Sequence, residues 1–307
     1  MKCKRMLSLC LSLLLLGLSG CGAGTNETVQ TSADPAPRSS TVSDGSAQQP
    51  ESSAETTPDT DKPTPAPQPE TPSSDTSEQT PENPLPQGDK YMAITFDDGP
   101  TGNESGRTER LLDGLKQRDA HATFFLCGYR IKDFNSMMNR YLAEGHEVGN
   151  HTMDHVRLDT KTNDGGYAQI SATNDLIASY TGQKPTLMRP TGGAYNDAVI
   201  SSMQQLGLPI ILWNIDTLDW KDHDNAALIK QRIVENAQDG AIVLEHDLYE
   251  ATVEGVLAAI DELQAQGYAF VTVSELAQLK GVTLEPGKVY SGFTEHDTVV
   301  ESGANYS

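Results

Sequence analysis

From residue 91 to residue 273 the chain alternates short apolar runs with amphipathic stretches, and this alternation constrains the fold most. The apolar runs have the length of buried strands, and the stretches between them repeat apolar residues at helical spacing. The predicted strands cover residues 91–96, 122–126, 147–148, 185–188, 209–215, 241–244 and 269–273. The predicted helices lie around 111–115 and over 134–143, 165–180, 197–206, 226–237 and 252–266. This order is typical of an α/β fold with a parallel sheet covered by helices, either open or closed into a barrel.

Composition confines this fold to the later part of the chain. All 18 aromatic residues lie beyond residue 88, whereas residues 22–88 hold 12 of the 17 prolines. A segment so poor in large apolar residues buries too little surface to offset its ordering entropy, so we expect a disordered linker over 21–88. It is either a tether that lifts a domain off a membrane or low-complexity filler. The remainder predicts one domain over 89–280 and a short polar tail over 281–307.

The first 20 residues predict an export signal. Lys2, Lys4 and Arg5 precede an apolar run of about 13 residues, which is too short to cross a bilayer. The run ends at Leu18-Ser-Gly-Cys21, which resembles the lipobox of bacterial lipoproteins, whose cysteine carries a diacylglyceryl anchor. We therefore expect a signal peptide over 1–20, a lipidated Cys21, and a protein held on the outer face of the cell membrane. The alternative is an ordinary signal peptide with an incidental cysteine.

Charge and cysteine content exclude several classes of protein. A net charge of −21 without a basic stripe excludes a generic nucleic-acid binder, and the single apolar run excludes a multi-span membrane protein. Of the four cysteines, Cys3 and Cys10 lie in the signal and Cys21 would be lipidated. Only Cys127 remains, so no intramolecular disulfide is expected. Because Cys127 ends an apolar run, we expect a buried strand residue rather than a nucleophile.

Polar residues follow five of the predicted strands, where parallel α/β folds place their active sites. Two histidines, His151 and His155, are four residues apart, and with one carboxylate they can form a metal site with open positions. Asp97 and Asp98 are neighbours at a strand end, so their side chains point to opposite faces and can take different roles. Either motif alone also fits surface histidines or an acidic turn. The five segments together favour a catalytic site: 95–100, 151–155, 188–193, 216–220 and 244–247.

These motifs, in this order over about residues 89–280, resemble those of the polysaccharide deacetylases of carbohydrate esterase family four, the NodB-homology domain. The resemblance implies a distorted (β/α) barrel that removes N- or O-acetyl groups from sugars with one divalent metal ion. It implies that Asp98, His151 and His155 bind the metal and that Asp97 is the general base. Two imidazoles and one carboxylate suit zinc, and also cobalt, nickel or iron.

The resemblance also implies roles for the other motifs. Arg189 would orient Asp97, and the Gly192 N–H would stabilise the oxyanion. His246 would protonate the departing amine, with Asp219 orienting it. Two side chains would wall the small acetyl pocket, Trp220 and Leu244.

The third motif departs from the family pattern. The family usually reads Arg-Pro-Pro-Tyr-Gly, whereas this chain reads Arg-Pro-Thr191-Gly192-Gly193. A main-chain donor survives the loss of the tyrosine, but an aromatic wall of the cleft does not. Outside the motifs, we expect His146 to be structural and Asn196 to cap the helix at 197–206.

The sequence therefore predicts a lipid-anchored deacetylase of a β-1,4-linked glycan, with the N-acetylglucosamine of peptidoglycan as first choice and chitin-like oligomers next. O-acetylated xylan and a small acetylated metabolite are the alternatives within the same chemistry. The alternative outside it is a non-catalytic glycan-binding module that adheres to the wall. The intact set of Asp97, Asp98, His151, His155 and His246 argues against that module, because glycan binding alone does not require all five. The sequence does not set the oligomeric state.

Overall fold

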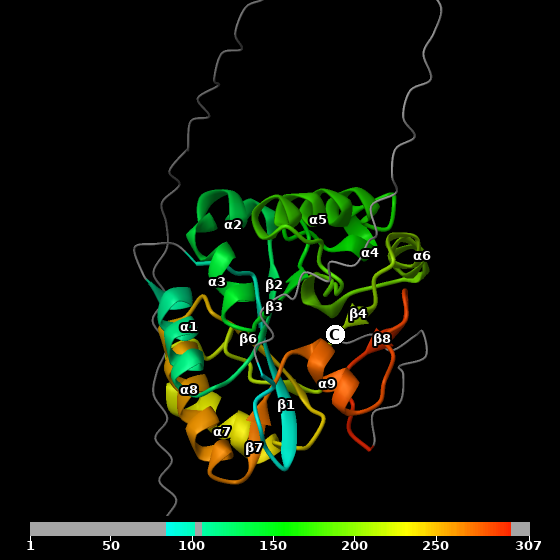
Figure 1. Cartoon of the computed structure of the whole chain (residues 1–307). Coiled ribbons are helices and arrows are strands. Elements are labelled where there is room, and N and C mark those ends of the chain that lie inside the picture. Colours follow the sequence, from blue (N-terminus) through cyan, green and yellow to red (C-terminus); the bar gives the residue numbers. More distant parts are fainter. Residues whose placement is uncertain (1–83, 102–105, 296–307) are drawn as a thin grey trace, which may run out of the picture. The chain divides into compact units, whose positions relative to one another are not determined.

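The structure is a computed structural model that describes residues 84–101 and 106–295 (Figure 1). The predicted signal peptide, Cys21 and nearly all of the predicted linker lie outside the described residues. Within the described ranges, no helix combines the length and the apolar character that crossing a membrane requires.

A parallel sheet forms the centre of the domain. Its strands are β1 (Lys90–Asp97), β2 (Thr123–Leu126), β3 (Glu147–Asn150), β5 (Ile215–Asp216), β6 (Ile242–His246) and β7 (Tyr268–Phe270). The order is β3-β2-β1-β6-β5, and β7 also pairs with β1. The short strands β4 (Ile210–Ile211) and β8 (Val289–Tyr290) pair with each other, and Met188 bridges β3 to β4. The strands therefore curve into the distorted barrel that the sequence predicted.

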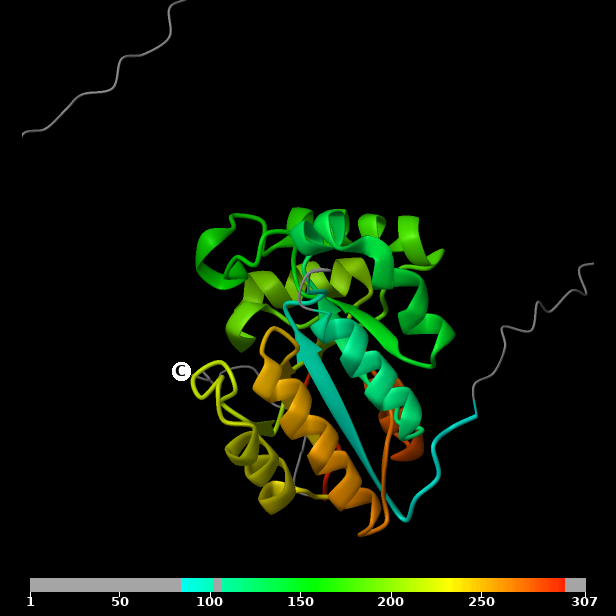
Figure 2. The ribbon, with the colours of Figure 1, turned by 90° about the vertical axis from the view of Figure 1, so that its left-hand side faces the viewer.

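Helices follow the strands and cover the sheet. They are α1 (Arg107–Gln117), α2 (Gly128–Asp133), α3 (Met138–Ala143), α4 (Leu158–Lys161), α5 (Tyr167–Thr181), α6 (Asp197–Leu206), α7 (Ala226–Asn236), α8 (Glu250–Gln264) and α9 (Val273–Leu279). Two short 3₁₀ turns are η1 (Asn135–Met137) and η2 (Thr191–Gly193). Figure 2 shows α1 and α8 lying side by side along β1, and α8 also packs on α7.

The main core lies between the sheet and these helices. On α1, Leu111, Leu112 and Leu115 recur at helical spacing and are fully buried. They join one apolar cluster with Phe96 of β1 and Phe124 of β2, whose rings stack at 5.1 Å between centroids. This packing fixes the strands, and with them the loops that leave their carboxyl ends.

Three predicted elements differ from those observed. The helix predicted over 134–143 is shorter, because Phe134 has non-helical backbone angles (φ −133°, ψ 50°) and the chain then forms η1 before α3 begins at Met138. The strand predicted over 185–188 is reduced to a bridge at Met188, since Pro185 cannot donate to a ladder. The strand predicted over 209–215 is split: the Leu212 N–H bonds to Tyr290 and the Asn214 N–H to Ile242, so the chain crosses from β8 to β6.

Folded structure also continues beyond the expected boundary at Lys280. The strand β8 lies beyond this boundary, and Tyr290 and Phe293 are buried in a second apolar cluster. Neither β8 nor α9, which ends just before the boundary, was predicted. The expected polar tail therefore does not begin at Gly281. The cap predicted at Asn196 is confirmed, because its side chain accepts a hydrogen bond from the Val199 N–H at 3.0 Å.

Candidate active site

Three side chains that ligate metals in proteins converge at the carboxyl ends of β1 and β3. The ligand atoms of Asp98, His151 and His155 all lie within 4.8 Å of one another. Oδ1 of Asp98 lies 3.3 Å from Nε2 of His151 and 2.9 Å from Nε2 of His155. Burial alone would raise the pKa of Asp98, but hydrogen bonds from the two histidines hold it well below its usual value. The sequence predicted that these three residues would come together.

The orientation of His151 suits a metal ligand. Its Nδ1 lies 2.8 Å from the carbonyl oxygen of Arg189, and a carbonyl can only accept, so Nδ1 carries the proton. With Nδ1 held by this carbonyl, Nε2 of His151 is the nitrogen through which a metal ion would be bound. His155 is more open, with 41% of its side chain exposed. Two imidazole nitrogens and a carboxylate oxygen directed at one point fit a divalent transition metal with room for further ligands.

The loops that carry these residues are backbone outliers. Asp98 (φ 68°), Thr152 (φ 73°) and His155 (φ 52°) all have left-handed backbone conformations without being glycine. Such conformations cost free energy and persist where the surroundings enforce them, most often at functional sites. Here the buried Asn150 side chain accepts a hydrogen bond from the Thr152 N–H at 2.8 Å and so fixes the turn between the two histidines.

Asp97 lies between a buried arginine and the metal-ligating group. Its Oδ1 accepts a hydrogen bond from Nη1 of Arg189 at 2.8 Å, and its Oδ2 lies 3.7 Å from Nε2 of His151. Asp97 is 3% exposed and Arg189 is completely buried, so the pair is shielded from water. Arg189 thus leaves one oxygen of Asp97 directed at the site, as the sequence predicted.

Sequence reasoning missed how firmly Arg189 is held. Its Nε and Nη2 donate to the main-chain oxygens of Ile211 and Leu212, and its Nη1 also donates to the hydroxyl of Thr95. The guanidinium carbon lies 4.2 Å from the centre of the Phe125 ring. The centre of the Trp213 ring lies 5.5 Å from the same carbon. A guanidinium with this many partners has no freedom to leave Asp97.

His246 and Asp219 form the second pair of the site. Nδ1 of His246 lies 2.8 Å from Oδ1 of Asp219, and the buried Asp219 also accepts hydrogen bonds from the main chain of His246 and of Trp220. Thr252 donates to Asp219 at 2.9 Å, a contact that the sequence did not indicate. Burial lowers the pKa of His246, but Asp219 outweighs it and raises that pKa to about 9. His246 is therefore protonated at neutral pH, with Nε2 free of Asp219.

The third motif forms the short turn η2. Gly192 and Gly193 both have left-handed backbone (φ 63° and 66°). A side chain at Gly192 would meet nothing within 4 Å, whereas a Cβ at Gly193 would lie 2.9 Å from the ring of Trp213. Glycine at 193 is therefore needed for the approach of Trp213, while the position of the family's tyrosine is open space.

The two residues predicted to wall the acetyl pocket differ in exposure. Leu244 is buried in β6, two residues before His246, whereas Trp220 is 51% exposed next to Asp219. Cys127 is buried, as expected, and burial raises the pKa of its thiol far above the usual range, which does not suit a nucleophile.

A further buried carboxylate ties these loops together. Asp247 is fully buried and accepts a hydrogen bond from Thr108 at the start of α1. The Thr108 hydroxyl also lies 2.8 Å from that of Thr101, just after the Asp97–Asp98 segment. A Cβ at Gly99 would lie 3.0 Å from Asp247, so glycine permits this approach. The contact joins residues about 140 positions apart, which no sequence pattern reveals.

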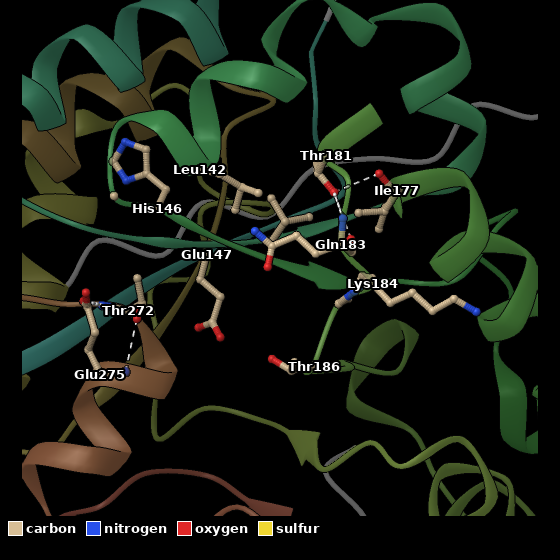
Figure 3. A pocket seen from close by; sticks show the side chains of 13 residues that line it. Leu142, His146, Glu147, Ile177, Thr181, Gln183, Lys184, Thr186, Thr272 and Glu275 are labelled. Atoms are coloured by element: carbon tan, nitrogen blue, oxygen red, sulfur yellow. Dashed lines mark hydrogen bonds between the residues drawn. The ribbon is translucent and has the colours of Figure 1, made fainter. Parts of the chain in front are cut away.

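A second group of histidines and carboxylates lies at the amino end of β3, around a pocket of about 250 Å³ (Figure 3). Glu147 points into this pocket and accepts hydrogen bonds from Ser274 and Thr123. His146 is buried, and its Nδ1 accepts from the Ala122 N–H at 3.2 Å. Burial lowers the pKa of His146 to about 3, so the ring stays neutral, in line with the structural role expected of it.

Comparisons with known proteins agree with this geometry. The family model described as polysaccharide deacetylase matches residues 85–211. A peptidoglycan-N-acetylglucosamine deacetylase of Bacillus cereus is 37% identical over 201 residues, 64% of this chain and 92% of its own length. The peptidoglycan-N-acetylglucosamine deacetylase PgdA of Listeria monocytogenes is 40% identical over 219 residues, 71% of this chain. The solved structure of the peptidoglycan deacetylase PdaC from Bacillus subtilis superposes with a TM-score of 0.59 at 39% identity, covering 62% of this chain and 92% of that one.

The match covers less than half of the Listeria protein. This chain spans 45% of the length of that relative.

Proposed function

The chain belongs to the polysaccharide deacetylase family, and from that premise we propose that it hydrolyses N-acetyl groups of a cell-wall glycan. The observation that carries the proposal is the position of Asp97. One of its oxygens is held by Arg189 and the other faces His151, within a set of residues suited to bind a divalent metal. A base, an acid and an electrophile at one strand edge are the groups that amide hydrolysis needs.

Asp98, His151 and His155 would hold the metal ion. Zinc is our first choice because it accepts two imidazoles and a carboxylate; cobalt, nickel and iron accept the same donors. When bound, the ion supplies Lewis-acid activation of the acetyl carbonyl.

Asp97 would act as the general base. The Arg189 guanidinium occupies Oδ1, which leaves Oδ2 to take the proton from the attacking water. The same contact holds the carboxylate in place and prevents its rotation. A developing oxyanion would be stabilised by the N–H of Gly192.

His246 would act as the general acid. Asp219 binds its Nδ1, so the proton on Nε2 is the one that can be given to the departing amine. Leu244 and Trp220 would form the apolar walls around the acetyl methyl group, with Trp220 at the open side.

The proposed substrate is the N-acetylglucosamine of peptidoglycan. The relatives in Bacillus cereus and Listeria are named for this activity, whereas another in Bacillus subtilis is named a peptidoglycan-N-acetylmuramic acid deacetylase. Chitin-like oligomers, O-acetylated xylan and a small acetylated metabolite are the substrates to be compared with it. A wall-facing enzyme is consistent with the export signal and lipidated Cys21 that the sequence predicts, and we propose an extracytoplasmic, membrane-anchored location.

Acetate release tests the proposal. The full chain is incubated with purified peptidoglycan, chitin oligomers and acetylxylan, each with and without a chelator. We expect chelator-sensitive release that is fastest on peptidoglycan. Retained glycan binding without any acetate release would instead favour a wall-adhesion module.

A further inference from the structure

Arg130 lies beside the metal-ligating loop, in a segment that the function above does not use. The helix α2 begins where β2 ends, and its first residues pair with the turn between the two ligand histidines. The Gly128 N–H donates to the carbonyl oxygen of Thr152 at 3.0 Å, and the Tyr129 N–H donates to that of Met153 at 2.9 Å. Arg130 is the next residue, so its place is fixed relative to that turn.

Arg130 differs from every other arginine in residues 84–101 and 106–295. Each of the others lies within 4.0 Å of a carboxylate: Arg107, Arg110, Arg118, Arg140, Arg157, Arg189 and Arg232. The guanidinium of Arg130 has no such ion pair among those residues. Instead its Nε donates to the hydroxyl of the exposed Tyr129 at 3.0 Å. This bond limits the freedom of the side chain and leaves the two terminal nitrogens available.

The charge of Arg130 also acts on residues that follow β6. Burial raises the pKa of Asp247 to about 6, and the positive charges of Arg130 and His246 limit that rise. Burial and nearby carboxylates raise the pKa of Tyr249, which follows β6, and Arg130 again opposes the rise. Arg130 is therefore close enough to act electrostatically on the loops after both β2 and β6.

We propose that Arg130 binds a carboxylate of the glycan, on a sugar next to the one that is deacetylated. The proposal rests on the proposed function and narrows its substrate. In peptidoglycan strands without stem peptides the sugar beside N-acetylglucosamine carries a free lactyl carboxylate, whereas chitin and xylan backbones carry none there. Where a stem peptide is attached, this group is an amide, so the proposed contact selects peptide-free strands. A guanidinium can bind such a group through two parallel hydrogen bonds.

The charge of the protein gives Arg130 weight in selectivity. The chain carries a net charge of −21, so an anionic glycan is repelled by most of the surface. Without Arg130, the carboxylates around the site would disfavour a second negative charge, and neutral glycans would bind better. Arg130 then adds an attractive contact for the acidic ligand within a largely negative protein.

Binding measured without turnover tests the proposal. The chelator-treated full chain is titrated with three peptide-free tetrasaccharides: one with the lactyl carboxylates, the same one with these reduced to alcohols, and chitotetraose. We expect wild type to bind the acidic ligand about tenfold more tightly than the reduced one. Arg130→Gln should abolish this preference and leave chitotetraose affinity within about twofold, and Arg130→Lys should keep part of the preference. A fourth ligand carrying stem peptides shows whether a peptide carboxylate adds to the effect.

The matched control is Arg118→Gln. Arg118 pairs with Asp261 at the end of α1, away from the strand ends, and its replacement removes the same charge. The proposal is overturned if wild type does not distinguish the acidic from the reduced ligand. It is also overturned if Arg130→Gln weakens all three ligands equally, or if Arg118→Gln reproduces its effect. Acetate release from chitotetraose by wild type reports on the proposed function separately, whichever way the binding result falls.

Discussion

The two ends of the sheet carry similar residues in different states. At the carboxyl ends, Asp98 and His151 direct acceptor atoms at a shared point from loops with left-handed backbone. At the amino ends, Glu147 is saturated by Ser274 and Thr123, and His121 pairs with Glu275 at 3.0 Å. Glu275 also completes a capping box with Thr272 at the start of α9.

The difference shows that residue type alone does not make a site. The amino-end groups pair with one another and with a helix terminus, and they do not form one of the close ligand groups found among the described residues, so they serve the fold. The carboxyl-end groups are held by Arg189, Asn150 and Asp219 in positions that leave one atom of each free. Substitutions at the two ends should therefore separate activity from stability.

The largest expected effect is that of Asp97→Asn. Loss of the general base should lower the rate of acetate release by about 10²–10⁴-fold. The buried Arg189 would also lose its counter-charge, so the free energy of unfolding should fall by about 3–5 kcal/mol. Initial rates of acetate release measure the first effect, and thermal unfolding measures the second.

The matched control is Glu147→Gln at the amino end, where a partly buried, hydrogen-bonded carboxylate is replaced by its amide. Its rate should stay within about twofold of wild type. Equal losses of rate in the two variants would break the distinction between the two ends.

The next effect concerns the pH dependence set by His246. The carboxylates facing it are Asp219, Asp97 and Asp98, with Asp247 beside it, and its pKa is raised to about 9. As a general acid His246 must be protonated, so activity should fall as the pH rises through that value. The interaction with Asp219 also adds stability below pH 6.5, which is lost as the pH rises through about 9.

Asp219→Asn tests this assignment. Removing the negative charge lowers the pKa of His246, so the alkaline limb of the rate profile should move to lower pH. A limb that stays in place would show that another group controls it.

A smaller effect is expected for His146→Gln. His146 faces the positive charges of His121 and Arg140, and its buried ring has a pKa of about 3. In the unfolded chain His146 binds a proton near pH 6.5, whereas in the folded chain it stays neutral until about pH 3. The free energy of unfolding therefore falls as the pH drops from about 6.5 towards 3. Glutamine keeps an acceptor for the Ala122 N–H but cannot titrate. Thermal midpoints should therefore fall less between pH 7 and pH 5 than in wild type, and a larger fall would contradict this role.

The smallest expected effect is that of Cys127→Ala. Cys127 lies at the carboxyl end, with its sulfur 3.9 Å from Oδ1 of Asp98, but its thiol is buried and protonated. We expect acetate release within about threefold of wild type and a stability loss of about 1 kcal/mol. A loss of rate comparable with that of Asp97→Asn would give the thiol a chemical role.

Local signals in the sequence predicted some elements to the residue. The helix α6 begins after Asn196 and ends before Gly207, where the cap and the glycine stand. The turn η1 has no such signal, so the helix that begins at Met138 was predicted to begin at Phe134. The capping box of Thr272 and Glu275 is recognisable in the sequence, but α9 was not predicted from it.

The candidate site likewise contains residues that the sequence predicted and contacts that it did not. The family resemblance implied that Asp98, His151 and His155 share a metal, and these residues meet where parallel strands of one sheet end. The contacts that hold the site come from distant residues. Thr252 on Asp219 and Thr108 on Asp247 join segments whose proximity only the fold creates.

Metal stoichiometry tests the central claim most directly. The full chain, stripped with chelator and titrated with zinc or cobalt, should bind one equivalent. His155→Ala should lose most of that affinity, whereas His121→Ala, which removes a histidine of the amino-end group, should bind as wild type does. Unchanged binding by His155→Ala, or loss of binding by His121→Ala in a folded protein, would contradict the assignment of the metal site to the carboxyl ends of the strands.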